Sequence, residues 1–145
     1  MFDKILIVCI GNVCRSPMAE QLLREAVADR LISVSSAGLH ALVGKPMDVS
    51  AQKALENHGH TSHSHIARQL EKSHLQQADL VLAMEKSHIE AIHAMAPETR
   101  GRVFLMGKWQ GNREIPDPYK QSESMFEHTY TLLNEAVEAW KSRLK

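Results

Sequence analysis

The 145-residue chain has only two cysteines, Cys9 and Cys14, and both lie in one short motif. Two cysteines so close together cannot form the disulfide framework of a small secreted protein. No hydrophobic run approaches the roughly 18 residues that a membrane span needs. The short apolar N-terminal segment lacks the small-residue cleavage site of a signal peptide. We therefore expect a cytoplasmic protein that is not inserted in a membrane.

The chain also lacks an excess of either charge, because 17 lysines and arginines balance 17 aspartates and glutamates. A neutral chain has no bulk attraction to nucleic acid, and we expect no nucleic-acid partner. With 43% hydrophobic and 23% charged residues, the composition is that of an ordinary globular protein. The length suits one core, and no linker or repeat divides the chain, so residues 1–145 are expected to form a single domain.

Hydrophobic patterning predicts four short buried strands that alternate with helices. The strands are expected at 4–8, 31–38, 78–85 and 101–107, and the helices at 17–30, 49–58, 71–77, 86–96 and 123–144. Ser16 is the candidate N-cap of the first helix, with Pro17 as its first residue, and Asp48 is the candidate cap of the second. This order predicts an α/β fold, a four-stranded parallel sheet with helices on both faces and right-handed crossovers.

The link between the first strand and the first helix has the composition of an anion-binding loop. Its sequence, CIGNVCRS, runs from Cys9 to Ser16 and places successive backbone N–H groups at a helix N-terminus. Gly11 and Asn12 tolerate backbone conformations that other residues avoid. Arg15 adds a planar fork of donors suited to two phosphate oxygens. We therefore expect a phosphate-binding loop directly after the first strand.

Cys9 ends the first strand, inside this predicted anion site. A lone cysteine that closes an apolar strand is more often an inert buried residue. A thiol in a field of amides and an arginine is instead expected to form the thiolate, which Ser16 can stabilise with a hydroxyl hydrogen bond. The arginine and serine that follow at fixed spacing favour the second interpretation, in which Cys9 attacks a bound phosphoryl group.

The motif Cys9-Ile-Gly-Asn-Val-Cys-Arg-Ser-Pro resembles the phosphate loop of the low-molecular-weight protein-tyrosine phosphatases. The similarity extends along the chain through SSAGL at 35–39, SHIARQL at 64–70, ADLVLAMEKSH at 78–88 and IPDPY at 115–119. The segments LHALVGK and MAPETRG are most similar to the bacterial branch associated with exopolysaccharide tyrosine kinases. The resemblance implies a cysteine-dependent hydrolase of phosphotyrosine that needs no cofactor and no metal.

The resemblance also implies the roles of individual residues. Cys9 would be the nucleophile, Arg15 would bind the phosphoryl oxygens, and Asp117, between two prolines, would be the general acid and base. Substrate contacts would come from the loop itself and from two side chains beside it: Ile10, Gly11, Asn12, Val13, Cys14, Ser16, Leu42 and Tyr119. Lys120 replaces a second tyrosine that is frequent in the family, which predicts a more open pocket.

Four polar residues match positions that support the phosphate loop in this family: Asn12, Ser16, Ser36 and His65. Their expected role is a hydrogen-bond network that holds a strained loop in shape. Cys14 has two interpretations that stay open. It is either a small buried residue or, as the resemblance implies, a resolving thiol that forms a reversible disulfide with Cys9 under peroxide.

Other functions compete with this interpretation. Four histidines, at positions 58, 60, 63 and 65, could form a metal-binding module, although their spacing matches no common zinc pattern. A thiol-dependent arsenate reductase can use a similar fold and loop, but it relays oxidation through further cysteines that this chain lacks. A catalytically inactive phosphopeptide-binding domain would need neither the thiol nor the acid. The partner that the resemblance implies is a phosphotyrosine protein, such as an autophosphorylating tyrosine kinase of capsule or exopolysaccharide export.

Overall fold

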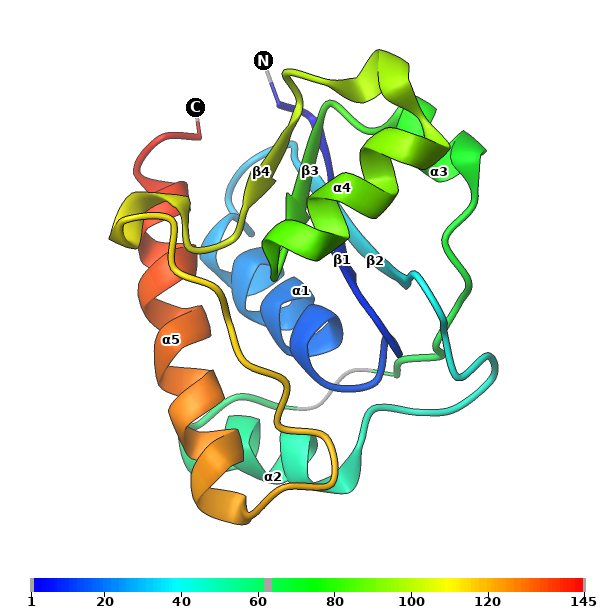
Figure 1. Ribbon diagram of the computed structural model, residues 1–145. Coiled ribbons are helices and arrows are strands. Elements are labelled where there is room, and N and C mark those ends of the chain that lie inside the picture. Colours follow the sequence, from blue (N-terminus) through cyan, green and yellow to red (C-terminus); the bar gives the residue numbers. More distant parts are fainter. Residues whose placement is uncertain (1, 62–63, 145) are drawn as a thin grey trace.

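The computed structural model describes residues 2–61 and 64–144, and it contains one parallel sheet of four strands (Figure 1). The strands are β1 Lys4–Cys9, β2 Ser33–Gly38, β3 Leu80–Ala83 and β4 Val103–Leu105. Their order across the sheet is β2-β1-β3-β4, and every neighbouring pair is parallel. The predicted α/β class and the parallel sheet are therefore confirmed.

Helices connect the strands, as the patterning predicted. They are α1 Arg15–Ala26, α2 Val49–Asn57, α3 Lys72–Gln77, α4 Lys86–Met95 and α5 Glu123–Lys141, with short 3₁₀ turns at Pro97–Thr99 and Lys108–Gln110. Among residues 2–61 and 64–144, no helix has both the length and the apolar character that crossing a membrane requires.

The sheet is covered on both faces, which explains why β1 is apolar throughout. Alternate side chains of a strand point to opposite faces. Ile5 and Ile7 therefore pack with α1, α2 and α5, whereas Leu6 and Val8 pack with α3 and α4 in a second, smaller core. Figure 1 shows α4 on one side of the sheet and α1 and α5 on the other.

The closing helix α5 supplies much of the larger core. Five large side chains at helical spacing along one face of α5 are all buried: Phe126, Tyr130, Leu133, Val137 and Trp140. The indole nitrogen of Trp140 also donates a hydrogen bond to the carbonyl of Met106, directly after β4, at 2.9 Å. The helix therefore joins the edge of the sheet to α1, against which it packs.

Two predicted helix starts have different outcomes. Asp48 caps α2 as expected, since its Oδ1 accepts a hydrogen bond from the Ser50 amide at 2.9 Å. The predicted cap of α1 was wrong. This helix begins at Arg15 with Cys14 as its N-cap, and Ser16 lies inside the first turn. The Ser16 hydroxyl is bonded to Cys9 and Asn12 instead, so a contact within the loop replaces the local cap.

The strands that follow β1 in the sequence are added first on one side of it and then on the other, and this fixes where a site can form. The connection from β1 through α1 leads to β2 on one side, whereas the later strands β3 and β4 add to the other side. In sheets of this kind, the crevice at the carboxyl ends of the strands beside such a change of side is the usual ligand site. The loop after β1 lies at this point.

Candidate active site

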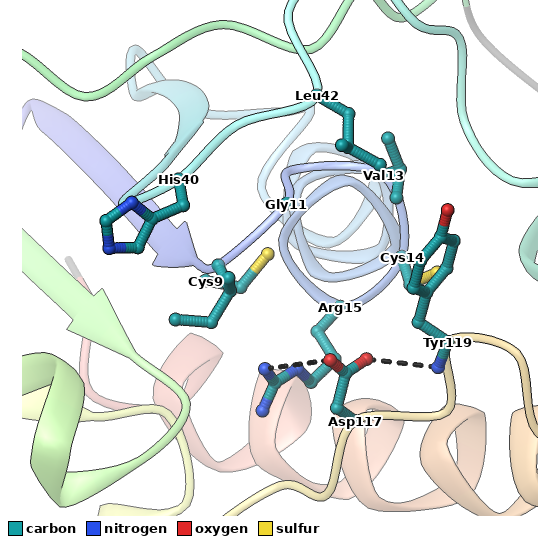
Figure 2. Close-up of a pocket in the computed structure, with 10 residues that line it drawn as sticks. Cys9, Gly11, Val13, Cys14, Arg15, His40, Leu42, Asp117 and Tyr119 are labelled. Atoms are coloured by element: carbon teal, nitrogen blue, oxygen red, sulfur yellow. Dashed lines mark hydrogen bonds and ion pairs between the residues drawn. The ribbon is translucent and has the colours of Figure 1, made fainter.

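The loop from Cys9 to Arg15 curves around a small pocket at the carboxyl end of β1 (Figure 2). Cys9 is the last residue of the strand and Arg15 the first residue of α1. Because the strand and the helix are both packed into the core, the two ends of the loop are fixed by the fold. The pocket is lined by Cys9, Ile10, Gly11, Val13, Cys14, Arg15, His40, Leu42, Asp117 and Tyr119.

Every carbonyl oxygen of the loop from Cys9 to Cys14 accepts a hydrogen bond from outside the loop. The donors, in order, are the amides of Leu39 (2.9 Å), His40 (3.0 Å) and Leu42 (3.0 Å), the His65 ring (2.6 Å), and the amides of Asp48 (2.9 Å) and Met18 (3.0 Å). In a trans peptide, the C=O and the following N–H point in opposite directions. The amides of residues 10–15 are therefore turned toward the interior of the loop, where they form a cradle for an anion.

Asn12 holds the middle of this loop. Its backbone has a positive φ of 60°, a conformation that asparagine tolerates better than most residues. The side chain is fully buried, and its Nδ2 donates to the hydroxyls of Ser16 (2.7 Å) and Ser36 (3.0 Å). Its Oδ1 accepts a hydrogen bond from the Arg68 amide at 3.0 Å. One side chain thus joins the loop to α1, to β2 and to the segment before α3.

The hydroxyl of Ser16 lies 2.9 Å from the sulfur of Cys9. Because this hydroxyl already accepts a hydrogen bond from Asn12, its own hydrogen is available to the sulfur. The Ser16 hydroxyl is thus placed to donate a hydrogen bond to the sulfur of Cys9. The geometry agrees with the expectation that Ser16 supports a nucleophilic sulfur.

Two further residues brace the loop from outside. The ring of His65 must donate from Nε2, since its partner is the carbonyl of Asn12. Gly38 ends β2 against the loop, and a Cβ built on it would lie 2.4 Å from the carbonyl oxygen of Ile10. Only glycine allows this approach. The predicted supporting residues Ser36 and His65 therefore do lie against the loop.

Only 2% of the surface of Arg15 is exposed, and its guanidinium is held by two acceptors. Nη1 donates to Glu85 Oε2 at 2.5 Å and to the carbonyl of Ile115 at 2.8 Å. Both hydrogens of Nη1 are used in this way, which leaves the Nε and Nη2 edge for an oxyanion. Sequence reasoning missed Glu85, although its position at the carboxyl end of β3 pointed toward the site.

His88, on the first turns of α4, lies beneath this pair and is almost fully buried. Its Nε2 is 3.7 Å from Glu85 Oε2. Burial lowers the pKa of His88, and the Arg15 charge lowers it further, in spite of the opposing effect of Glu85. The imidazole is therefore neutral at pH 7, and the Glu85 carboxylate is left to pair with Arg15.

Asp117 lies across the pocket from the cradle, on the proline-bracketed loop. Its side chain is 46% exposed, and its Oδ2 is 3.6 Å from Arg15 Nη2. Its Oδ1 accepts a hydrogen bond from the Tyr119 amide at 3.0 Å (Figure 2). An exposed carboxylate beside the anion cradle is able to exchange protons with both a bound group and water.

The upper walls of the pocket are apolar. Val13, Leu42 and Tyr119 lie along the same side of the opening, and His40 lies on the other side of it, beside Cys9 (Figure 2). Sequence reasoning missed His40, and only its position between the family-like segment SSAGL at 35–39 and the predicted contact Leu42 could have suggested it. Apolar side chains thus form most of the rim of the pocket.

Cys14 shares the loop with Cys9, and both thiols are free and buried. Burial raises the pKa of the Cys14 thiol well above its usual range, and the charges of Asp48, Asp117 and Cys9 raise it further. Cys14 is therefore protonated at neutral pH and is a poor nucleophile in this state.

The histidine-rich segment makes separate contacts. His58 stacks on Tyr130 with ring centroids 4.0 Å apart, and its Nε2 lies 2.7 Å from Glu127. The two ring nitrogens of His60 lie 2.9 Å from Glu25 and 2.9 Å from the Tyr130 hydroxyl. His65 supports the phosphate loop, and position 63 lies outside the described residues. Among the described residues, no three potential ligands gather around one point.

Comparison with known proteins places these features in a family. Residues 4–145 match the family model described as low molecular weight phosphotyrosine protein phosphatase. The low molecular weight protein-tyrosine-phosphatase Wzb of Salmonella typhimurium is 48% identical over 144 residues, which cover 99% of this chain and 95% of Wzb. Vibrio vulnificus Wzb, solved in complex with benzylphosphonate, has a TM-score of 0.95 at 42% identity and covers 99% of this chain and 100% of its own.

A more distant structure has another printed activity. The YwlE arginine phosphatase from Geobacillus stearothermophilus has a TM-score of 0.90 at 30% identity, and the match covers 99% of this chain and 92% of that one. One scaffold thus occurs in proteins named for phosphotyrosine and for phosphoarginine. The walls of the pocket, more than the fold, must distinguish the two substrates.

Replacement of Ser36 by alanine tests the support of the loop. Ser36 accepts a hydrogen bond from the buried Asn12 amide and donates one to the partly buried Glu20 carboxylate, and its loss leaves each of them with one partner fewer. We expect Ser36→Ala to lose about 1–3 kcal/mol of unfolding free energy in urea. We also expect weaker binding of inorganic phosphate by calorimetry.

Ser35 provides a matched control, because it is the preceding residue of β2 and its side chain points to the opposite face. Ser35→Ala should change the unfolding free energy by no more than about 0.5 kcal/mol. Equal effects of the two substitutions on stability and on phosphate binding would contradict a supporting role for Ser36.

Proposed function

This chain belongs to the low molecular weight phosphotyrosine protein phosphatase family, and we propose that it hydrolyses protein phosphotyrosine through a phosphocysteine intermediate. It is a protein-tyrosine-phosphatase by family. The observation that carries the proposed mechanism is the position of the Cys9 sulfur beside an inward-facing amide cradle, with Asp117 across the same pocket.

In the first step, the cradle amides and the free edge of Arg15 bind the oxygens of the phosphoryl group. The Cys9 thiolate attacks phosphorus, the S–P bond forms, and the bond from phosphorus to the tyrosine oxygen breaks. Asp117, in its protonated form, gives its proton to the departing oxygen. The products of this step are tyrosine, a phosphocysteine and an ionised Asp117.

In the second step, Asp117 acts as a base. Its carboxylate takes a proton from a water molecule, the water oxygen attacks phosphorus, and the S–P bond breaks. Inorganic phosphate leaves, and the sulfur returns to the thiolate that Ser16 stabilises. No cofactor enters this scheme, because the thiolate supplies the nucleophile and Arg15 supplies the positive charge.

The apolar rim supports phosphotyrosine as the substrate. An aromatic ring gains from contact with Val13, Leu42 and Tyr119, whereas a phosphorylated guanidinium would lose hydration against the aliphatic side chains of Val13 and Leu42. The benzylphosphonate bound by the Vibrio vulnificus relative also carries an aromatic ring next to its acidic group. Phosphotyrosine is therefore favoured over phosphoarginine, the substrate named for the YwlE structure.

The physiological partner that we propose is an autophosphorylating tyrosine kinase of capsule or exopolysaccharide export, encountered in the cytoplasm. Support comes from the resemblance of LHALVGK and MAPETRG to the bacterial branch, and from the similarity to Wzb along nearly the whole chain. The neutral overall charge suits a protein substrate better than a nucleic acid.

We also propose that Cys14 protects Cys9 from oxidation. Hydrogen peroxide would convert the Cys9 thiolate to a sulfenic acid, and the Cys14 thiol would then attack that sulfur, form the disulfide and release water. The chain has no other cysteine, so no other internal thiol can resolve the sulfenic acid.

The mechanism predicts a specific pattern of activity on aryl phosphates in the presence of EDTA. Wild type should turn over, and Cys9→Ser should be inactive. Asp117→Ala should be slowed about 10²–10⁴-fold on phenyl phosphate, whose leaving group needs a proton. The loss should be much smaller on para-nitrophenyl phosphate, whose leaving group is stable as the anion. Steady-state kinetics on both substrates measures the difference.

A matched control for Asp117 is Asp29, an aspartate that is 82% exposed and lies outside the pocket. Asp29→Ala should keep wild-type activity on both substrates. Loss of wild-type activity in EDTA would contradict the metal-free scheme. Hydrolysis of phosphoarginine with a higher kcat/KM than phosphotyrosine would contradict the proposed substrate class.

The protective role of Cys14 predicts that oxidation of the wild type is reversible. After brief treatment with peroxide, dithiothreitol should restore the activity of the wild type, because the disulfide can be reduced. Cys14→Ser, compared with its own untreated activity, should stay inactive, because the sulfenic acid proceeds to the sulfinic acid. Equal recovery of both proteins, or the absence of a Cys9–Cys14 linked peptide in mass spectra, would exclude this role.

The proposed partner can be tested with a phosphorylated kinase. A tyrosine kinase of exopolysaccharide export should lose its phosphotyrosine signal in an immunoblot when wild-type enzyme is added. Cys9→Ser should leave the signal intact and should retain the kinase on a column. A kinase that keeps its phosphates with active enzyme would remove the proposed partner and leave the enzymatic activity unaffected.

A further inference from the structure

A second hollow lies directly beside the active-site pocket, on the outer side of its apolar rim. Its volume is about 290 Å³, and it is lined by Val13, Leu42, Lys45, Pro46, Met47, Asp48, Val49 and Tyr119. Three of these residues, Val13, Leu42 and Tyr119, also line the active-site pocket. One wall of side chains therefore separates the place proposed for the phosphotyrosine ring from the hollow.

The surface around this hollow has an unusual concentration of exposed aliphatic side chains. Of the large hydrophobic residues exposed among the described part of the chain, Leu42, Val43 and Val49 belong to the single segment that forms the hollow. Val49, the first residue of α2, is 79% exposed, so its side chain does not pack in the core. Apolar groups that gather at one margin of a site indicate a contact surface.

We propose that this hollow binds an aliphatic side chain that directly flanks the phosphotyrosine of the substrate protein. The inference rests on the proposed phosphotyrosine phosphatase function. Neighbouring Cα atoms of a chain are about 3.8 Å apart. When the phosphotyrosine ring lies between Leu42 and Tyr119, an adjacent residue of the same chain therefore lies over the outer face of these two side chains, where the hollow begins.

The floor of the hollow is held in shape before any substrate arrives. Two backbone hydrogen bonds join the segment at 44–45 to Ala67. The Gly44 amide donates to the Ala67 carbonyl at 3.0 Å, and the Ala67 amide donates to the Lys45 carbonyl at 2.8 Å. The Asp48 amide is bonded to Val13 in the phosphate loop at 2.9 Å, and its carboxylate caps α2. A preorganised apolar surface binds an aliphatic group without a further cost of ordering.

Phosphotyrosine peptides of matched sequence test this subsite. One pair carries leucine or serine immediately before the phosphotyrosine, and a second pair carries them immediately after it. Wild type should favour leucine in at least one pair by about fivefold in kcat/KM, mainly through a lower KM, since part of an aliphatic side chain leaves water. Val49→Ser should remove this preference.

The matched control is Leu31→Ser, because Leu31 is an aliphatic residue that is 98% exposed. It precedes β2 and so lies at the amino ends of the strands, whereas the site lies at their carboxyl ends. This variant should keep the wild-type preference. All three proteins should hydrolyse para-nitrophenyl phosphate equally, since it has no flanking residue.

The outcomes separate this inference from the proposed function. If the wild type hydrolyses neither para-nitrophenyl phosphate nor a single one of the peptides, the proposed function itself is overturned. Hydrolysis of all peptides without a preference for leucine would overturn only the subsite. A leucine preference that survives in Val49→Ser, with thermal unfolding unchanged, would also overturn it, because the preference would then come from another surface.

Discussion

The whole site depends on the direction in which the peptide planes of one loop are turned. Each carbonyl from Cys9 to Cys14 is bonded to a donor outside the loop, and this turns the amides inward. Asn12 makes the turn possible, because it accepts a positive φ and joins the loop to three other segments. The donors come from α1, from the segment after β2, from the start of α2 and, through His65, from the segment before α3. The fold must therefore be nearly complete before the cradle exists.

Arg15 brings a second constraint, since a buried cation is costly unless it is paired and hydrogen-bonded. Glu85 at the end of β3 and the carbonyl of Ile115 meet this need on one edge of the guanidinium. The neutral state of His88 matters here, because a charged imidazole would compete with Arg15 for the same carboxylate. The edge toward Asp117 is bonded less tightly, at 3.6 Å, and is the one that an incoming anion can take.

Most of the fold could be predicted from the sequence, because the apolar runs and their lengths are local signals. Asp48 was found as a helix cap for the same reason. Ser16 was assigned to a cap wrongly, since its hydroxyl serves Cys9 and Asn12, a competition that no local pattern reveals. Glu85 was missed because a carboxylate at a strand end gains meaning only when β3 lies beside β1. The motif located the chemistry, but the contacts between segments had to come from the fold.

The division of the site between segments has a consequence for specificity. The groups proposed for the chemistry lie on the β1–α1 loop and on the loop of Asp117, whereas most of the residues that line the second hollow come from the segment 42–49. The backbone of this segment holds the cradle through the Leu42 and Asp48 amides, while the side chains of Leu42, Val43 and Val49 are exposed. Side chains such as Val49 can therefore change without moving the peptide planes that bind the phosphoryl group. Selection for a different substrate sequence can act on the exposed side chains of the hollow while the cradle stays the same.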